Sequence, residues 1–269
     1  MTHPKQILSR YGIDPKKSLG QNFIVDNSIL TGIVEAASLT DSDEVLEVGP
    51  GLGDLTRLLA SNSKRVVGVE IDGRLILILE ERLAGWQNIQ IIQGDILDVI
   101  PGEIFQGNYK VVGNLPYYIT GQLFRKFLSF EKKPSLLIFT VQKEVAQRIT
   151  AGPGKMSLFA LIVQFYAKVK LVRTIKAGSF WPRPNVDSAV IRLDVFETLP
   201  LSTKDEARFI KLAKVGFSHK RKQLQKNLRQ MGFSNSELSS SLSRAGIDGT
   251  RRAESLSLEE WLLLYQALY

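Results

Sequence analysis

The stretch VLEVGPGLGDLT, residues 45–56, decides the fold of this chain. Its apolar run ends in three glycines, Gly49, Gly51 and Gly53, and a helix-like segment begins directly after them. Glycine lets the backbone turn tightly and lets a ligand approach the first turn of the following helix. The G-x-G-x-G spacing, with Pro50 inside it, differs from the G-x-G-x-x-G pattern of dinucleotide-binding folds. The stretch therefore predicts a strand, a turn and a helix around a nucleotide-type cofactor.

Strand-like and helix-like segments alternate on both sides of this stretch. Such alternation predicts βαβ units and a mostly parallel sheet that is covered on both faces, which is an α/β fold. The expected strands are 44–48, 65–70, 88–92, 110–113 and 135–141, with 164–172 and 188–196 as candidates for an antiparallel edge, and the expected helices are 27–38, 55–61, 74–83 and 122–130. Near residues 199–202 the composition changes to short, charged, helical segments, so we expect a catalytic domain at 1–200 and a helical domain at 201–269.

The composition excludes several classes of protein. The 269 residues are 44% hydrophobic and can bury a large core. Cysteine is absent, which excludes disulfides, a thiolate nucleophile and a cysteine zinc site, and the two histidines make a histidine metal site a poor expectation. The sequence shows neither a signal peptide nor an apolar run of about 18 residues. We therefore expect a cytoplasmic protein without a metal or a membrane span, and nothing in the sequence requires more than a monomer.

The positive charge of the chain is concentrated near its end. The net charge is +8, and residues 208–229 hold eight basic side chains and no acidic one. Apolar residues interleave with these cations, which favours helices that each carry one cationic face. A solvated helical face is one interpretation, but cations without compensating acids favour a polyanionic partner, and nucleic acid is the natural candidate.

The ends of the second and third expected strands carry carboxylates. Glu70 ends one strand and Asp95 follows the next. Ligands of open α/β sheets bind where strands end, so Glu70 is placed to accept hydrogen bonds from a ribose diol and Asp95 to address an adenine amine. Each carboxylate alone is commonly a helix cap or a surface residue. Together with the glycine turn, they predict a site for an adenosine-containing cofactor.

The fourth strand end reads GNLPYYIT, residues 113–120, and its NLPY resembles the N/D-P-P-Y motif of S-adenosylmethionine-dependent amino-methyltransferases. An adenine amine is a poor nucleophile, so it needs placement more than deprotonation. The side-chain carbonyl of Asn114 and the backbone carbonyl of Leu115, exposed by the kink at Pro116, could accept its two hydrogens. Tyr117 would stack on a base that is unpaired or flipped out.

Five stretches in order extend the resemblance to nearly the whole chain: KKSLGQNFIVD (16–26), EVGPGLGDLT (47–56), GNLPYYIT (113–120), FWPRPNVDSAV (180–190) and GFSHKRKQLQKNL (216–228). Together they resemble the ribosomal RNA adenine dimethyltransferases, and within them the KsgA/RsmA group. The resemblance implies a Rossmann-like S-adenosylmethionine-dependent methyltransferase fold with a mostly parallel seven-stranded sheet and a small all-α C-terminal domain. It also implies dimethylation of two adjacent adenosines near the 3′ end of 16S rRNA, on a small-subunit precursor late in its biogenesis.

The same resemblance assigns roles to single residues. It puts Phe180 on the face of the target adenine opposite Tyr117, and a base held between two rings gains stacking energy. It places Lys220, Arg221 and Lys222 on rRNA phosphates. No general base is assigned, because the protonated product can lose its proton to water. Around the cofactor the resemblance places Asn22, Ile24, Gly49, Gly51, Glu70, Asp95 and Asn114.

Three alternatives stay open at this point. Methyltransferases of the Erm type, which modify one large-subunit adenosine, share the fold, although NLPY and GPGLG fit the small-subunit group better than the NIPY and GPGKG typical of Erm. A DNA adenine methyltransferase is disfavoured because the chain has no sizeable target-recognition insertion. A non-catalytic assembly or transcription factor with this fold is disfavoured because Glu70, Asp95 and Asn114 are all present.

Overall fold

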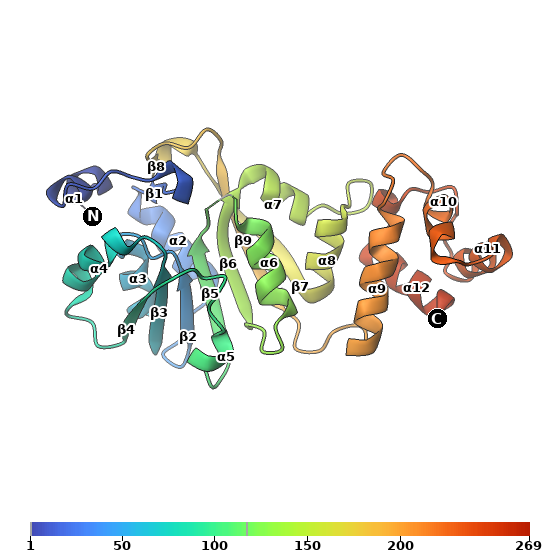
Figure 1. The fold of residues 1–269 in the computed structure, drawn as a ribbon, viewed down its shortest axis with the longest axis horizontal. Helices are drawn as coiled ribbons and strands as arrows, with labels where there is room; N and C mark the ends of the chain where they lie inside the picture. Colours follow the sequence, from blue (N-terminus) through green and yellow to red (C-terminus); the bar gives the residue numbers. More distant parts are fainter. Residues whose placement is uncertain (1, 117) are drawn as a thin grey trace. The chain divides into compact units, whose positions relative to one another are not determined.

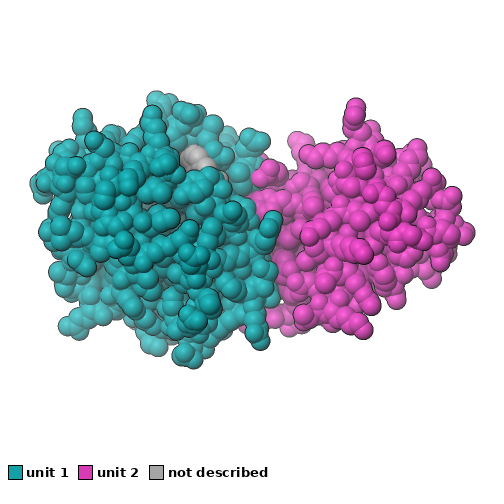
Figure 2. Space-filling view, in the orientation of Figure 1, with its two compact units in different colours: residues 1–146, 170–195 teal, residues 147–169, 196–269 magenta. Residues whose placement is uncertain are grey.

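The computed structural model describes residues 2–116 and 118–269. They form two compact units, which are coloured separately in Figure 2. Unit 1 contains residues 1–146 and 170–195, and unit 2 contains residues 147–169 and 196–269. Unit 2 thus includes the expected helical segment 201–269, and it also takes in residues 147–169, which the sequence analysis placed in the first domain.

Unit 1 is built around a seven-stranded sheet with the strand order β4-β3-β2-β5-β6-β9-β7 (Figure 1). The pairs β2–β3, β3–β4, β2–β5 and β5–β6 are parallel, and β9 runs antiparallel to β6. This arrangement confirms the predicted α/β fold with a mostly parallel sheet. The strands are β2 (Glu44–Val48), β3 (Arg65–Glu70), β4 (Ile89–Gln93), β5 (Tyr109–Asn114), β6 (Leu136–Gln142), β7 (Ala167–Ile175) and β9 (Ser188–Val195).

Helices cover both faces of this sheet, as the buried runs of the strands require. On one face, α2 (Asn27–Ala37) and α3 (Asp54–Ala60) form a core cluster with Val45, Val112 and Ile138. On the other face, Phe124 and Phe127 of α6 (Thr120–Ser129) pack against Phe139 of β6 with ring centroids 5.5 and 6.3 Å apart. The central strands are therefore buried on both sides, which explains their predominantly apolar sequences.

The order of the strands places the site. From β2 the chain moves outward to β3 and β4 and then returns to the other side of β2 as β5. Helices that leave two neighbouring strands on opposite faces open a crevice at the carboxyl ends of those strands, and ligands of such sheets bind there. The glycine turn after β2 and the GNLPYYIT stretch at the end of β5 therefore meet at one edge.

The N-terminal segment lies outside the sheet. It contains α1 (Pro4–Arg10), the short 3₁₀ turn η1 (Lys17–Leu19) and β1 (Phe23–Ile24), which pairs antiparallel with β8 (Phe180–Trp181). Further short elements of the chain are η2 (Gly73–Leu75), α4 (Ile76–Leu83), α5 (Pro101–Ile104), α7 (Lys143–Ile149) and η3 (Ala177–Ser179).

One predicted strand begins in the wrong place. Residues 164–172 were expected to form an edge strand, but residues up to Tyr166 belong to α8 (Leu158–Tyr166), and β7 starts at Ala167. Ser157 caps α8 by accepting from Ala160 N–H, and this cap commits the apolar run after it to a helix. A short apolar run alone does not distinguish a buried helix from a buried strand.

Unit 2 is helical apart from the start of β7. Trp261, Phe209 and Leu212 are among its buried side chains, and Phe165 stacks on Phe209 with centroids 4.8 Å apart. Ser234 and Ser257 each cap the start of a helix with a capping box. In it the serine side chain accepts from a backbone N–H three residues later, and the glutamate at that position accepts from the backbone N–H of the serine. Besides α8, its helical elements are α9 (Thr203–Gly216), α10 (Leu224–Leu228), η4 (Arg229–Met231), α11 (Asn235–Arg244), η5 (Ala253–Ser255) and α12 (Leu258–Leu268).

Candidate active site

The glycine turn after β2 has the backbone conformation that its sequence predicted. Gly49 and Gly51 adopt φ values of +69° and +60°, in the left-handed region that favours glycine. Apart from its two chain neighbours, no described residue has an atom within 4 Å of the position that a Cβ at Gly49 would take, so the backbone there borders open space. The N–H of Gly51 donates to Glu70 Oε2 at 3.0 Å. The turn thus joins the ends of β2 and β3 and leaves its outer side accessible to a ligand.

Glu70 is held in place at the end of β3. Its side chain is 4% exposed, and its second oxygen, Oε1, accepts from the backbone N–H of Asp72 at 2.9 Å. Burial raises the pKa of Glu70, while the two backbone donors oppose that rise. A carboxylate fixed by these two bonds still has lone pairs free to accept further hydrogen bonds. Glu70 lines the pocket, so a diol bound there can donate to them.

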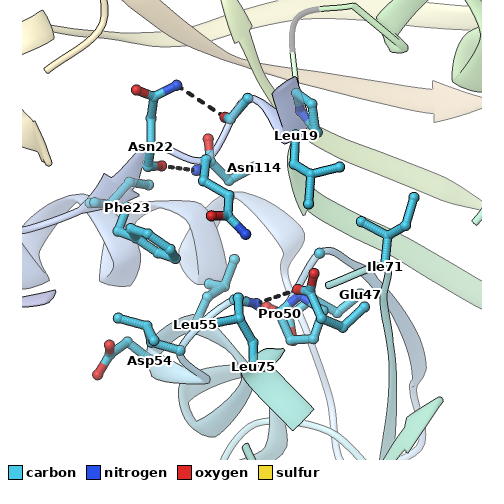
Figure 3. Close-up of a pocket in the computed structure, with 18 of the residues that line it drawn as sticks. Leu19, Asn22, Phe23, Glu47, Pro50, Asp54, Leu55, Ile71, Leu75 and Asn114 are labelled. Atoms are coloured by element: carbon cyan, nitrogen blue, oxygen red, sulfur yellow. Dashed lines mark hydrogen bonds between the residues drawn. The ribbon is translucent and has the colours of Figure 1, made fainter. Parts of the chain in front are cut away.

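A pocket opens beside these two features, and Figure 3 shows the side chains around it. Among its described lining residues there are three carboxylates and no lysine, arginine or histidine, although the chain as a whole carries a net charge of +8. The lining comprises Leu19, Gly20, Gln21, Asn22, Phe23, Ile24, Leu30, Glu47, Gly49, Pro50, Gly51, Leu52, Asp54, Leu55, Glu70, Ile71, Leu75, Asn114 and Pro116. Such a lining offers no cationic side chain to the phosphates of a dinucleotide.

The three carboxylates differ in their partners. Asp54 is neutralised by Arg57 at 2.7 Å and by Arg82 at 2.8 Å. Glu47, inside β2, is 1% exposed, and its Oε2 has no hydrogen-bond partner among the described residues. Burial raises the pKa of Glu47 to about 8. A buried carboxyl group with one unpaired oxygen that lines a pocket fits a bound cation, and S-adenosylmethionine carries a sulfonium and an ammonium group.

Asn114 lies at the end of β5, and Glu70 at the end of β3, so the two residues come from the strands on either side of β2. Its Nδ2 donates to the backbone carbonyl of Asn22 at 2.8 Å (Figure 3). This bond fixes the orientation of the amide, because only the nitrogen can donate. The amide oxygen of Asn114 is then left as an acceptor for a group that enters beside the pocket. The arrangement is suited to binding an amine through its hydrogens.

The rest of the NLPY motif continues this edge of the site. Leu115 is buried, and its N–H donates to the carbonyl of Thr140 on β6 at 3.1 Å. Pro116 lines the pocket, so the kink that it makes lies beside Asn114. Tyr117, predicted to stack on the target base, lies outside the described residues. The structure thus brings Asn114 and Pro116 to the pocket together.

Residues 13–269 match the sequence profile of a known family, Ribosomal RNA adenine dimethylase. The chain belongs to this family. Curated relatives called Ribosomal RNA small subunit methyltransferase A include one from Dehalococcoides mccartyi, 42% identical over 98% of this chain and 92% of its own, and one from Bacillus pumilus, 40% identical over 98% and 94%. Membership confirms the prediction of an S-adenosylmethionine-dependent rRNA adenine dimethyltransferase.

Solved structures with the same fold agree with this family. The 23S rRNA methyltransferase ErmE superposes with a TM-score of 0.80 at 28% identity, over 92% of this chain and 99% of that chain. A dimethyladenosine transferase from Plasmodium falciparum superposes with a TM-score of 0.79 at 27% identity, over 90% of this chain and 95% of that chain.

Most of the cofactor residues predicted for this adenine dimethylase line the pocket. Asn22, Ile24, Gly49, Gly51 and Glu70 all lie there together with Asn114. Asp95 does not line it: it follows β4, and its Oδ1 accepts from Leu97 N–H at 2.8 Å. The cofactor roles of all these residues stay predictions, and for Asp95 the pocket gives no support.

Phe180 is buried, and its stacking on the target adenine stays a prediction. It is 4% exposed and packs in the core cluster with Leu30 and Ile33 of α2, and it is not part of the pocket lining. The register of β8 against β1 pairs Phe180 with Ile24 and turns its ring toward the core. In this arrangement the ring is not open to a base, so the predicted stacking role has no support from the packing.

The basic segment of this adenine dimethylase lies in unit 2. All eight cations of residues 208–229 are exposed, and only Arg208 has an ion-pair partner among the described residues. Lys220, Arg221 and Lys222 lie in the turn between α9 and α10, where a cationic helix face was expected. Asn227, 1% exposed, holds this turn by donating to the carbonyls of Gly216 at 2.6 Å and His219 at 3.2 Å.

Sequence reasoning missed three residues of the site. Glu47 stands inside the first quoted stretch, and a carboxylate within an apolar strand was the signal for it. Gln21 and Asp72 carry no comparable signal, because their interaction joins positions far apart in the chain. Within residues 2–116 and 118–269, no group of acidic and histidine side chains is arranged to hold a metal, and no helix could span a membrane.

Proposed function

We propose that this chain dimethylates the 6-amino groups of two adjacent adenosines near the 3′ end of small-subunit rRNA, late in the assembly of the subunit. The curated relatives support the small subunit as the substrate, because they are 36 to 42% identical over nearly the whole chain and carry that subunit in their names. We further propose that the enzyme works as a monomer in the cytoplasm.

One observation carries the proposal: the amide of Asn114 is oriented by the carbonyl of Asn22 at the rim of an acidic pocket. An adenine amine has two hydrogens and a lone pair that is delocalised into the ring. Accepting a hydrogen through Oδ1 of Asn114 would favour a pyramidal nitrogen, with its lone pair directed into the pocket. The carbonyl of Leu115 is proposed to accept the second hydrogen.

S-adenosylmethionine, when bound, supplies an electrophilic methyl group on a sulfonium. Gly49, Gly51 and Glu70 would hold its adenosine portion, and Asn22 and Ile24 would cover it. Glu47 would face its positive charge. With the cofactor and the base bound, apolar lining side chains such as Phe23 and Leu55 would keep water away from the methyl group that is transferred.

The substrate must reach this site as a base that is not paired or stacked. Exposed cations on unit 2 would bind the phosphates of folded rRNA and position it without reading its sequence. Lys220, Arg221 and Lys222 are proposed to make such contacts.

A second candidate has a specific observation in its favour. The likeness to ErmE, a 23S rRNA methyltransferase, covers 92% of this chain. Its identity is 28%, against 42% for the small-subunit relative from Dehalococcoides mccartyi. The large subunit is therefore the alternative substrate.

The test supplies radiolabelled S-adenosylmethionine with unmethylated small subunits, large subunits or duplex DNA, and identifies the products by mass. We expect dimethyladenosine in small-subunit rRNA alone. Asn114→Ala should remove the label, while the matched control Asn62→Ala, at an exposed asparagine whose side chain donates to Leu58 O at 2.8 Å, should keep it. Label in the large subunit alone would move the chain to the Erm type.

A further inference from the structure

A segment before β1, residues 14–22, runs along the rim of the pocket, and we call it the strap. Its residues Leu19, Gly20, Gln21 and Asn22 line the pocket. Its backbone touches the catalytic stretch directly, because a Cβ at Gly20 would lie 3.0 Å from Cβ of Pro116. The strap also supplies the Asn22 carbonyl to which Asn114 donates. The orientation of the Asn114 amide therefore depends on where the strap lies.

Gln21 holds the strap through both polar atoms of its side-chain amide, the oxygen and the nitrogen. Oε1 accepts from the backbone N–H of Lys16 at 2.7 Å and closes the loop of the strap on itself. Nε2 donates to Oδ2 of Asp72 at 2.8 Å and ties this loop to the segment that follows β3. Since Asn22 is the next residue, these two bonds fix the part of the backbone that carries its carbonyl.

Asp72 is the buried anchor of the strap. It is 2% exposed and accepts from Arg74 through Nε at 2.9 Å and Nη2 at 2.7 Å. These bonds are the main reason that the pKa of Asp72 is lowered to about 2, so it is an anion in the working range of pH. Arg74 in turn donates to the strap carbonyl of Asp14 at 3.2 Å. Asp72 therefore secures the strap at two points.

The same residue reaches the cofactor side of the pocket. Its backbone N–H donates to Glu70 Oε1 at 2.9 Å. One chain of hydrogen bonds thus runs from Glu70 through Asp72 and Gln21 to the strap, and from the strap to Asn114.

We propose that Gln21 and Asp72 are positioning residues for methyl transfer: they hold the strap so that the Asn22 carbonyl keeps the oxygen of Asn114 turned toward the target amine. This inference rests on the proposed function of Asn114. When the strap shifts, Asn114 loses its partner and its amide can flip. The flipped amide points its N–H group at the N–H groups of the amine. Both groups are donors, so no hydrogen bond forms between them.

The test uses Gln21→Leu and Asp72→Asn in the full chain. At saturating cofactor on small subunits, we expect kcat to fall by about 10- to 100-fold, the range for a reacting group displaced by about 1 Å. The Kd for S-adenosylhomocysteine should rise only about threefold, because the glycine turn and Glu70 stay in place.

Matched controls separate positioning from loss of stability. Gln90→Leu removes a glutamine that accepts from Arg65 at 2.6 Å, and Asp43→Asn weakens an ion pair with Lys110 of 2.9 Å at the other end of the sheet. Neither Gln90 nor Asp43 lines the pocket, so kcat should stay within about twofold of the parent. Should Asp72→Asn fail to fold, Gln21→Leu decides by itself.

Two further measurements connect the effect to Asn114. In the background of Asn114→Ala, Gln21→Leu should lower the residual single-turnover rate no further, because it acts through the missing amide. In ¹⁵N NMR spectra, the side-chain signals absent from Asn114→Ala should shift in Gln21→Leu and stay unchanged in Gln90→Leu. This second measurement needs no rRNA.

The outcomes distinguish this inference from the proposed function. A parent protein without methyl transfer to small subunits would overturn the proposed function, while the NMR measurement would still test the link from Gln21 to Asn114. An active parent, together with additive losses in the double variant or unmoved Asn114 signals, would overturn the positioning role alone.

Discussion

Glu47 should make cofactor binding depend on pH, and Glu47→Gln should remove that dependence. The pKa of Glu47 is raised to about 8 because the side chain is buried within β2. At pH 7 the group is then neutral in about nine molecules out of ten in the free protein. A cationic cofactor favours the ionised form, so binding below pH 8 should release a proton from Glu47.

The magnitude follows from linkage. If Glu47 stays ionised in the complex, the observed affinity falls about tenfold for each pH unit below 8, or roughly 90-fold from pH 9 to pH 6. The glutamine variant has no proton to release at this position. It should bind more weakly than the parent at pH 9, and its affinity should lack this slope.

The same group should limit the stability of the free protein. Its pKa rises from 4.5 in the unfolded chain to about 8 in the folded one, so its contribution to stability is complete below pH 4.5. The contribution is lost as pH rises, because the unfolded state then binds fewer protons than the folded state. The loss is about 1.4 kcal/mol per pH unit up to pH 8. Glu47→Gln should therefore be more stable than the parent at pH 8.

Calorimetric titration of S-adenosylmethionine between pH 6 and pH 9, in two buffers with different heats of ionisation, measures both affinity and proton release. The amino group of the ligand also titrates near pH 8, but it contributes equally for both proteins. Glu44→Gln, on the same strand but half-buried at its other end, is the matched control and should behave as the parent. Equal pH slopes for the parent and Glu47→Gln would refute the reasoning.

Three further results are expected. Asn114→Ala should nearly abolish methyl transfer, with a loss of about 100-fold or more, and should leave binding to small subunits unchanged; a full rate would contradict the proposed alignment of the amine. Glu70→Ala should weaken S-adenosylhomocysteine about tenfold or more by calorimetry, because it removes an acceptor for the ribose, and unchanged affinity would take Glu70 out of that role. Replacing residues 220–222 by alanine should weaken subunit binding at constant cofactor affinity and reduce the slope of log affinity against log salt by about 2 to 3; an unaltered slope would remove the turn from the interface.

The alternation of apolar runs and helix-like segments in the sequence was sufficient to predict the central strands of the sheet. Runs such as 44–48 and 65–70 became β2 and β3 with unchanged bounds, since a strand buried on both faces is apolar along most of its length. Local rules were insufficient at residues 164–172, where a capped helix extends to Tyr166. The capping signal at Ser157 lies before this apolar run.

Some residues of the candidate site could be predicted from the sequence and others could not. Glycines and carboxylates at strand ends mark a site whenever parallel strands end at one edge, so Gly49, Glu70 and Asn114 could be found in the sequence. The burial of Phe180 could not be found in this way, because it follows from the pairing of β8 with β1. Residue types alone do not tell which side of a ring is covered.

The sequence by itself determined the α/β class, the family and the strand ends at which the chemistry would gather, because these depend on local periodicity and on short motifs. Only the tertiary structure decided that Glu47 is buried with one oxygen unpaired among the described residues, and that Asn114 donates to Asn22. The same holds for the strap, which is anchored through Gln21 and Asp72. Burial and hydrogen bonding arise between residues far apart in the chain, so their energies appear only when the fold has brought those residues together.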